Sequence, residues 1–232
     1  MKVVTWNIHR CIGLDGAYRP DRVASVLKSF DADVIALQEV DSSLLVTAQT
    51  NQLDYLAGEL GMESVMGPTL HSDYGAYGNA ILTRHEIVSC EEHDLSFRKF
   101  EPRGALAIVF RHASGTIRFL NTHLGLKYWE RAFQVDRLLS KLIWDESENV
   151  IVAGDFNEWL PWTGNNLRLE RSFSLYSKRM ATFPSKWPRF ALDRIFASGS
   201  VKKLECKVVS EPTARVASDH LPVVAEIEFE NL

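Results

Sequence analysis

Short apolar runs that end in polar residues recur along the chain. The clearest is Val150–Ala153, four small or β-branched apolar residues followed by Gly154 and then by the polar Asp155 and Asn157. An apolar run of this length, bounded by glycine, predicts a buried strand. Alternation at its end would send Asp155 and Asn157 to one side and Phe156 to the other. Polar groups at the mouth of a buried strand are costly unless they are hydrogen-bonded or bind a metal. The pattern therefore indicates either an Asx turn that ends the strand or a functional site.

Strands and amphipathic helices alternate along the rest of the chain. A helix that begins at Pro20 carries apolar residues at i, i+3, i+4 and i+7 from Val23 to Phe30. A second helix is expected over residues 52–60, because Gly61 supplies a C-terminal stop. Further helices are expected over 129–144, with apolar Leu138, Leu139, Leu142 and Ile143, and near 165–171. Strands are expected over residues 2–8, 33–40, 78–83, 87–97, 104–111, 116–124, 191–196, 202–209 and 221–229.

No boundary divides the chain into two units. Residues 160–190 are the least regular stretch, yet no repeat, low-complexity segment or linker is found anywhere. At 232 residues the chain fits one large domain with ample material for a core. We therefore expect one mixed α/β domain over residues 1–232.

Charge and cysteine content narrow the class of protein. The formal net charge of −4 excludes a uniformly basic surface that coats nucleic acid, although a local basic groove stays possible. Cys11, Cys90 and Cys206 are far apart, which argues against a zinc knuckle or a disulfide framework and favours a reducing compartment. No leader and no apolar run of membrane-spanning length is found. We expect a cytoplasmic monomer without a transmembrane segment.

The polar residues at the predicted strand ends form a set with a definite chemistry. Carboxylates, carboxamides and imidazoles that meet at one rim would repel one another without a cation. Oxygen-rich ligand sets suit Mg²⁺ or Mn²⁺ bound through carboxylates and a phosphate. Histidines beside such a metal can bind or protonate phosphoryl oxygens. The set fits metal-assisted phosphoester hydrolysis, and it comprises Asn7, Glu39, His123, Asp155, Asn157, Asp193, Asp219 and His220.

Seven motifs in a fixed order resemble the endonuclease/exonuclease/phosphatase superfamily, over residues 3–229. This family includes pancreatic-type deoxyribonucleases, sphingomyelinases and tyrosyl-DNA phosphodiesterases. The resemblance implies a four-layer α/β/β/α sandwich, with two packed mixed β-sheets, helices outside and a site at one edge. The motifs are T-W-N (5–7), L-Q-E-V (37–40), N-A-I-L-T-R (79–84), N-T-H-L (121–124), G-D-F-N (154–157), L-D-R-I-F (192–196) and S-D-H-L-P-V (218–223).

The resemblance also implies a set of metal ligands. By its position in the second motif, Glu39 is expected to be the principal Mg²⁺ ligand. Asn7 would lie beside it, as a ligand or as a hydrogen-bonding partner of a ligand. Asp219 would be a further ligand, directly or through water, and Mn²⁺ is expected to substitute for Mg²⁺.

Catalytic roles follow from the same comparison. Asp155 would orient or deprotonate the attacking water, and Asn157 would donate to the phosphate or to the base. His220 would contact the phosphate, with Asp193 fixing its tautomer and favouring the imidazolium. His123 would be a second imidazole on the phosphate, able to protonate the leaving oxygen. A tyrosine is typical here in apurinic endonucleases, so His123 points to the other branches.

Substrate contacts are less well determined by the sequence. Asn79 and Arg103 match family positions near the phosphate, but a strand-end hydrogen bond and a surface ion pair explain them equally well. The segment 172–192 has no acidic residue and interleaves cations with aromatic residues. That pattern suits a nucleic acid or an anionic membrane surface, or else a loop that packs its aromatic residues inward. Its cations are Lys178, Arg179, Lys186 and Arg189, of which Lys186 and Arg189 are the expected substrate contacts.

These observations predict a Mg²⁺-dependent phosphoesterase, and more specifically a phosphodiesterase. Water would be the nucleophile, and the substrate would be a nucleic acid or a phospholipid-type phosphodiester. The alternative is a catalytically inactive binding module that retains the fold. Such a module would be expected to have lost ligands, whereas Glu39, Asp155, Asn157 and His220 are all present.

Overall fold

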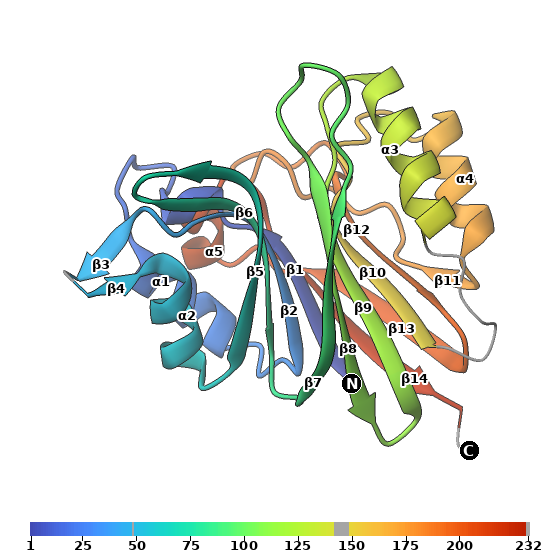
Figure 1. Ribbon diagram of the computed structural model, residues 1–232, viewed down its shortest axis with the longest axis horizontal. Coiled ribbons are helices and arrows are strands. Elements are labelled where there is room, and N and C mark those ends of the chain that lie inside the picture. Colours follow the sequence, from blue (N-terminus) through green and yellow to red (C-terminus); the bar gives the residue numbers. More distant parts are fainter. Residues whose placement is uncertain (48, 142–148, 231–232) are drawn as a thin grey trace.

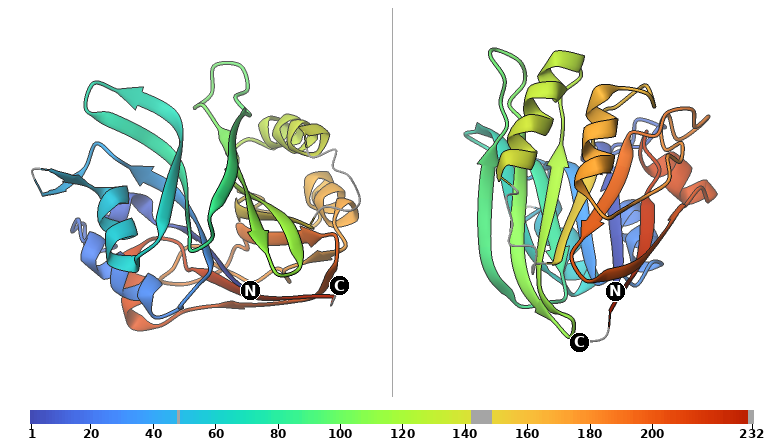
Figure 2. Two further views of the ribbon diagram at one scale, coloured as in Figure 1. Left: turned by 60° about the horizontal axis from the view of Figure 1, so that its bottom comes forward. Right: turned by 90° about the vertical axis from the view of Figure 1, so that its right-hand side faces the viewer.

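Two mixed β-sheets, each of six strands, lie face to face at the centre of the molecule (Figure 1). The structure is a computed structural model, and it describes residues 1–47, 49–141 and 149–230. Helices cover the two outer faces, and the layers are seen edge-on in Figure 2. The four-layer α/β/β/α sandwich expected from the motifs is confirmed.

The first sheet has β1 and β2 at its centre, and these two strands run parallel. Every other neighbouring pair in this sheet is antiparallel. In spatial order its strands are β13 (Val201–Val208), β14 (Val223–Phe229), β1 (Lys2–Asn7), β2 (Val34–Asp41), β6 (Gly75–Thr83) and β5 (Glu63–Ser72).

The second sheet repeats this plan with a parallel pair, β9 and β10, at its centre. Its other pairs are antiparallel. In spatial order its strands are β11 (Leu175–Tyr176), β12 (Asp193–Ser198), β10 (Asn149–Asp155), β9 (Gly115–His123), β8 (Gly104–His112) and β7 (Ile87–Asp94). A small third sheet pairs β3 (Leu45–Thr47) with β4 (Thr50–Asn51).

Three apolar layers separate the four layers of secondary structure. The central one lies between the sheets and holds Ile81, Phe110 and Ile151, among others. The first sheet packs its outer face on α1 (Pro20–Lys28), α2 (Gln52–Leu60) and α5 (Pro212–Ala217). The second sheet packs on α3 (Tyr128–Lys141) and α4 (Gly164–Ser172). A short 3₁₀ turn, η1 (His9–Cys11), follows β1. None of the described helices is long and apolar enough to cross a bilayer.

Local sequence signals fix several element boundaries. The side chain of Asn51 accepts a hydrogen bond from the backbone N–H of Asp54, and Gly61 ends α2 in the left-handed conformation. Thr163 caps α4 in the same way, which confirms the short helix expected near residue 165. The helix expected over 129–144 is observed as α3, and its predicted apolar residues Leu142 and Ile143 lie outside the described residues.

Three sequence-based expectations differ from the structure. The strand expected over 87–97 ends at Asp94. Strand β5 was not expected, because Gly67 and Pro68 interrupt its pattern; the proline is tolerated because β5 is an edge strand. Helix α5 lies where a polar loop was expected, since its six residues are too few to show a helical period.

A buried polar link joins the two sheets beneath one edge of the sandwich. Gln38 on β2 donates from Nε2 to Asn121 Oδ1 on β9 at 2.7 Å. Asn121 Nδ2 in turn donates to the backbone oxygens of Leu37 (2.7 Å) and Ala80 (2.8 Å). Both side chains are fully buried. Because these bonds are made between buried groups of both sheets, the link fixes the position of one sheet relative to the other.

We expect Asn121→Ala to destabilise the fold strongly. The change removes the bond from Gln38, which keeps its bonds to Thr5 and Ala36, and takes a buried donor away from two backbone carbonyls, which should cost roughly 2–5 kcal/mol. Urea unfolding monitored by circular dichroism would measure the loss. Thr116→Ala, an exposed change on the same strand, is the control. Equal, small losses in the two variants would show that water or other groups replace the link.

Candidate active site

The ends of the two parallel strand pairs bring the predicted polar residues to one edge of the sandwich. The register places Asn7 beside Gln38 in the first sheet. In the second sheet it places Asp155 between His123 and Asp193. A cavity of about 410 Å³ opens there. Its polar lining comes from Glu39, Glu101, Arg103, His123, Asp155, Asn157 and His220.

Unusual backbone geometry aims two of these groups into the cavity. Glu39 has a φ of +57° at a point where the register between β2 and β6 shifts, so the strand bulges there. Such a bulge places an extra residue in the strand and redirects its side chain. Gly154 has a φ of +153°, and a Cβ at this position would overlap with the backbone oxygen of Thr122. A glycine is therefore required directly before Asp155.

Asp193 and His220 form a buried pair. His220 Nδ1 lies 2.9 Å from Asp193 Oδ2, and Thr182 Oγ1 donates to the same oxygen at 2.5 Å. Burial by itself would lower the pKa of His220, but the carboxylates of Asp193 and Asp155 outweigh it and raise that pKa to about 10. The ring of Phe183 packs against the imidazole, with centroids 4.8 Å apart. His220 is therefore an oriented imidazolium at neutral pH.

Asp155 lies at the centre of the cluster. Its Oδ1 accepts the backbone N–H of Asn157 at 2.9 Å. Its Oδ2 lies 3.4 Å from His123 Nε2 and 3.6 Å from His220 Nε2. The side chain of Asn7 also donates to Oδ2, at 3.2 Å. This carboxylate is almost fully buried, and each of its contacts holds it in one orientation.

The orientation of Asn7 argues against its direct ligation of a metal. Its Nδ2 donates to Glu39 Oε1 at 2.9 Å as well as to Asp155. Its Oδ1 accepts the backbone N–H of His9 at 3.1 Å. Because a backbone N–H can only donate, the carbonyl oxygen of Asn7 faces away from the two carboxylates. Of the two roles expected for Asn7, the structure favours that of a hydrogen-bonding partner of Glu39.

His123 is a buried neutral imidazole. Burial lowers its pKa to about 3; the nearby Asp155 opposes this shift, and the charges of Arg103 and His220 add to it. Arg103 Nη1 lies 3.4 Å from Nδ1, and Asn157 Nδ2 lies 3.1 Å from Nε2. A neutral ring can accept or donate a hydrogen bond, but it holds no extra proton at neutral pH. The expected role of His123 as the acid for the leaving oxygen is therefore not favoured in this arrangement.

Arg103 and Asn79 lie next to the cavity. Arg103 is buried, pairs with Glu101 at 3.3 Å and lines the cavity, so it is not the surface ion pair considered as an alternative. Asn79 is buried, and its Nδ2 donates to the backbone oxygen of Gly104 at 3.0 Å. That bond is the strand-end role considered for Asn79, although its side chain also lines a small hollow beside Glu39.

The donors at this edge fit a hard divalent cation. Glu39 lines the cavity beside Asp155, and within the described residues only its Oε1 takes part in a hydrogen bond. Donor atoms of Asp155, Asp193 and His220 also lie within 4.8 Å of one another. Asp193 Oδ2, however, already accepts from His220 and Thr182. Asp193 also lies outside the lining of the cavity, whereas Glu39 and Asp155 belong to it, so these two are the better carboxylates for Mg²⁺, which prefers oxygen ligands. Asp219 is half-buried and does not line the cavity.

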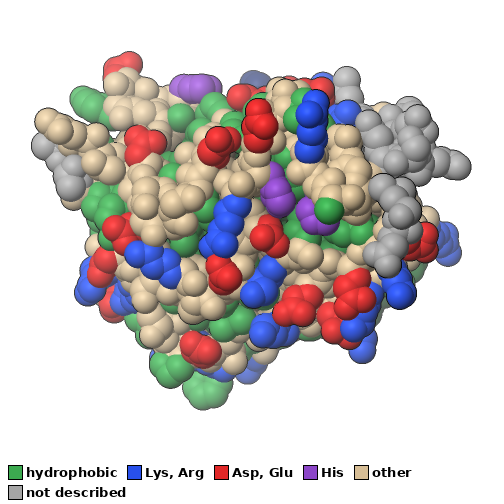
Figure 3. Space-filling model, turned by 90° about the horizontal axis from the view of Figure 1, so that it is seen from below, with side chains coloured by type: hydrophobic (Ala, Val, Ile, Leu, Met, Phe, Trp, Pro, Cys, Tyr) green, Lys and Arg blue, Asp and Glu red, His purple; other side chains and the backbone are tan. Residues whose placement is uncertain are grey.

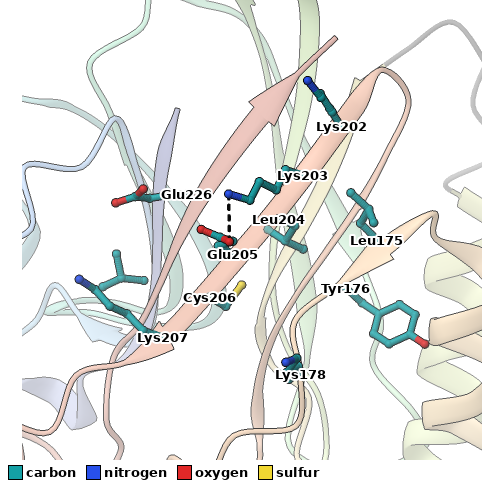
Figure 4. A pocket seen from close by; sticks show the side chains of 11 residues that line it. Leu175, Tyr176, Lys178, Lys202, Lys203, Leu204, Glu205, Cys206, Lys207 and Glu226 are labelled. Carbon is teal, nitrogen blue, oxygen red and sulfur yellow. Dashed lines mark ion pairs between the residues drawn. The ribbon is translucent and has the colours of Figure 1, made fainter.

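The cations of segment 172–192 do not form one arm over the cavity. Lys178 lines a separate groove of about 720 Å³ between β11 and β13 (Figure 4). Arg179 pairs with Glu170 at 2.9 Å and donates to the backbone oxygen of Pro161. Lys186 and Arg189 are exposed and do not line the cavity. None of the four cations lines the cavity, and the expectation that Lys186 and Arg189 contact the substrate stays a prediction.

The second half of that segment supports the site through uncharged residues. Besides the bond from Thr182 to Asp193, the backbone N–H of Leu221 donates to Thr182 O at 2.9 Å. Trp159 packs edge-on against Phe183 and Phe190, with centroids 5.6 and 5.0 Å apart. Sequence reasoning missed the role of Thr182, because no local pattern distinguishes it. It also missed Tyr77, which lines the cavity and lies two residues before Asn79.

Comparisons with known proteins agree with this arrangement. A family model described as the endonuclease/exonuclease/phosphatase family matches residues 4–220. The protein YbhP of Escherichia coli strain K12 is 28% identical over 98% of this chain and 96% of its own length. The mannosyl-6-phosphatase Bt3783 of Bacteroides thetaiotaomicron has a similar structure, with a TM-score of 0.78 and 20% identity over 99% of this chain and 100% of that one. The human Nocturnin catalytic domain with bound sulfate has a TM-score of 0.75 and 22% identity over 99% and 94% of the two chains.

The left-handed backbone conformation of Glu39 predicts an unusual order of stability among variants at this position. A residue with a side chain costs about 1–2 kcal/mol more than glycine in the left-handed conformation. We therefore expect Glu39→Gly to be more stable than Glu39→Ala by about 1 kcal/mol. Val88, exposed on β7, is the control: there alanine should be the more stable of the two replacements, as is usual in a strand. Urea unfolding of the four variants tests this, and the same order at both sites would contradict the assigned backbone geometry.

Proposed function

Because the chain belongs to the endonuclease/exonuclease/phosphatase family, we propose that it is a Mg²⁺-dependent phosphodiesterase that uses water as its nucleophile. The observation that carries the proposal is the buried Asp193–His220 pair, whose imidazolium faces Asp155 across the cavity. His220 as proton donor and Asp155 as proton acceptor are thus held in one site, beside the carboxylate of Glu39.

Each side chain has a role that its contacts support. Asp155 accepts a proton from the attacking water, since it is a fixed carboxylate at the centre of the cluster. The imidazolium of His220 donates to a phosphoryl oxygen, with Asp193 and Thr182 as positioning residues. Arg103 adds positive charge to the lining of the cavity, next to His123. Asn157, held by the backbone oxygen of Leu124 at 2.9 Å, fixes the ring of His123.

The carboxylate of Glu39 would hold the metal ion, oriented by Asn7. Asp155 lies close enough to contribute, whereas Asp219 would act through water because its side chain is outside the cavity wall. When bound, Mg²⁺ supplies positive charge that stabilises the phosphoryl oxygens in the transition state. Mn²⁺ has the same preference for oxygen ligands and should replace it.

A diester fits the cavity better than a phosphomonoester. The mouth of the cavity is bounded by apolar side chains, those of Leu126, Trp159 and Phe183. A diester carries a single negative charge and a second substituent that such side chains can contact. A dianionic monoester would bring a second negative charge into a cavity that Glu39 and Glu101 also line. A nucleic acid and a phospholipid both provide phosphodiesters of this kind.

The alternative of an inactive binding module does not account for the buried charges. Removing charged groups from water costs several kcal/mol per ion, and an apolar pair of similar volume is often at least as stable. A module without catalytic function would have no need for Asp155, Asp193 and His220 to be buried together.

Activity is expected to require the divalent cation. Hydrolysis of bis(p-nitrophenyl) phosphate should stop in EDTA and return with Mg²⁺ or Mn²⁺. Glu39→Gln should raise the metal concentration needed for half-maximal rate by at least about 10-fold, because the ligand loses its charge. Glu59→Gln, an exposed change at a residue paired with Lys28, is the control. Full activity in chelator would exclude this proposal.

The Asp193–His220 pair should behave as one unit. Asp193→Asn and His220→Ala should each slow turnover by a factor on the order of 10²–10⁴. The double variant should be little slower than either single variant, because the two residues act together. Asp136→Asn, at an exposed residue paired with Arg168, is the control for loss of one carboxylate. Losses that multiply in the double variant would mean that the two residues act independently.

A further inference from the structure

Large apolar side chains are exposed on the loops that surround the cavity. Among the described residues every exposed tryptophan is found there: Trp129, Trp162 and Trp187 have 59%, 73% and 69% of their surface exposed. Four neighbouring apolar residues are exposed as well. Together they form what we call the apolar rim, which consists of Phe100, Leu126, Tyr128, Trp129, Leu160, Trp162 and Trp187.

The topology places the whole apolar rim at the active-site end of the sandwich. Its residues come from the β7–β8 loop, the β9–α3 loop with the first turn of α3, the β10–α4 loop and the β11–β12 loop. Each of these segments begins or ends at the strand edge that carries Asp155, and the β7–β8 loop and the start of α3 stand at the top of Figure 1. Leu126 itself lines the cavity. The opposite end of the molecule instead shows acidic and basic side chains intermixed over its surface (Figure 3).

Core packing does not explain the apolar rim. The chain fills its core with other aromatic residues, since Phe156 and Phe173 pack on Phe196, and of the apolar rim only Phe100 stacks on a partly buried ring, that of Phe97, among the ring contacts of the described residues. Single exposed apolar residues are normal on a protein surface, but a group around a binding cavity marks an interaction site. Tryptophan and tyrosine are the residues that favour the boundary between water and lipid, because their rings are apolar and carry one polar group.

We propose that the apolar rim docks on a phospholipid bilayer and that the cavity receives the phosphodiester of a phospholipid from that surface. The choice of substrate rests on the phosphodiesterase function proposed above, whereas the docking itself does not. In the reaction, the oxygen of water bonds to phosphorus and one P–O ester bond breaks. The proton lost by the water passes to Asp155, which later returns it to the solvent, and the leaving oxygen takes a proton from solvent water, so that a phosphomonoester and an alcohol result.

The charges near the apolar rim complement an anionic lipid surface. Lys127, Lys186 and Arg189 are exposed in the same loops, and none forms an ion pair with a described residue. Each such cation near a membrane surface is attracted to anionic headgroups. Lys186 and Arg189, which were expected to contact the substrate, would thus lie outside the cavity and face the membrane.

The composition of the apolar rim favours lipid over nucleic acid. Single-stranded nucleic acid is bound by aromatic platforms along a continuous track of cations. Here Leu126 and Leu160 are aliphatic and cannot stack on bases as aromatic rings do. Two nearby arginines are also already neutralised within the protein, Arg131 by Glu158 at 2.8 Å and Arg179 by Glu170.

Vesicle binding tests the docking directly. The full chain would be floated with phosphatidylcholine vesicles and with vesicles that also contain phosphatidylglycerol, in EDTA so that no hydrolysis occurs. We expect binding to both, stronger to the anionic vesicles, and quenching of tryptophan fluorescence by lipids with brominated acyl chains. The triple variant Trp129→Ala/Trp162→Ala/Trp187→Ala should bind at least about 10-fold more weakly, since binding scales with the apolar area inserted. Leu45→Ala/Val88→Ala, which removes exposed apolar side chains elsewhere, should bind as the wild type does.

Activity measurements separate this inference from the proposed function. In Mg²⁺, the ratio of vesicle phospholipid hydrolysis to bis(p-nitrophenyl) phosphate hydrolysis should fall about 10-fold or more in the triple variant. Failure of the wild type to bind vesicles, with hydrolysis of the soluble diester intact, would overturn the docking and leave the phosphodiesterase proposal standing. Tryptophan-dependent vesicle binding without hydrolysis of any diester would support the docking and reject the lipid substrate together with the proposed function. Tight, rim-dependent binding of single-stranded DNA with no vesicle binding would also overturn the inference.

Discussion

The parallel pairing of two central strands in each sheet is the constraint on which the site depends. Parallel neighbours end at the same edge, so β1 with β2 and β9 with β10 deliver their last residues to one end of the sandwich. The buried link between Gln38 and Asn121 then holds the two sheets in register beneath that edge. Without this alignment Glu39 and Asp155, which belong to different sheets, would not line one cavity.

Carboxylates that lie close together repel one another, and neighbouring side chains of the protein offset this repulsion. Asn7 donates to both Glu39 and Asp155, and the imidazolium of His220 lies between Asp155 and Asp193. The opposite pKa shifts of His123 and His220 follow from this arrangement. Both rings are buried, but only His220 has a carboxylate on each side. The surroundings of the two rings therefore make His220 charged and His123 neutral, although both lie at the same edge of the sandwich.

The loops at this edge differ in composition from the strand ends that they connect. Strand ends carry the buried polar groups, whereas the connecting segments expose tryptophan, tyrosine and leucine around the cavity mouth. Such a division gives a rigid site surrounded by an apolar surface. The phospholipid proposed above, with a charged phosphodiester and apolar chains, would match both parts.

The sequence by itself determined the order of most strands and helices and the residues at the strand ends, because apolar periodicity, caps and glycine stops act between near neighbours. Gly61 ends α2 as expected, and Asp155 and Asn157 lie at the end of a buried strand. The sequence did not reveal that Thr182 donates a hydrogen bond to Asp193 or that Arg103 is buried. It also did not show that the side-chain oxygen of Asn7 faces away from the two carboxylates. Nor did it show that the cations of segment 172–192 separate, with Lys178 in another groove and Arg179 paired with Glu170. These facts depend on which side chains meet across the fold, and packing between segments distant in sequence decides them.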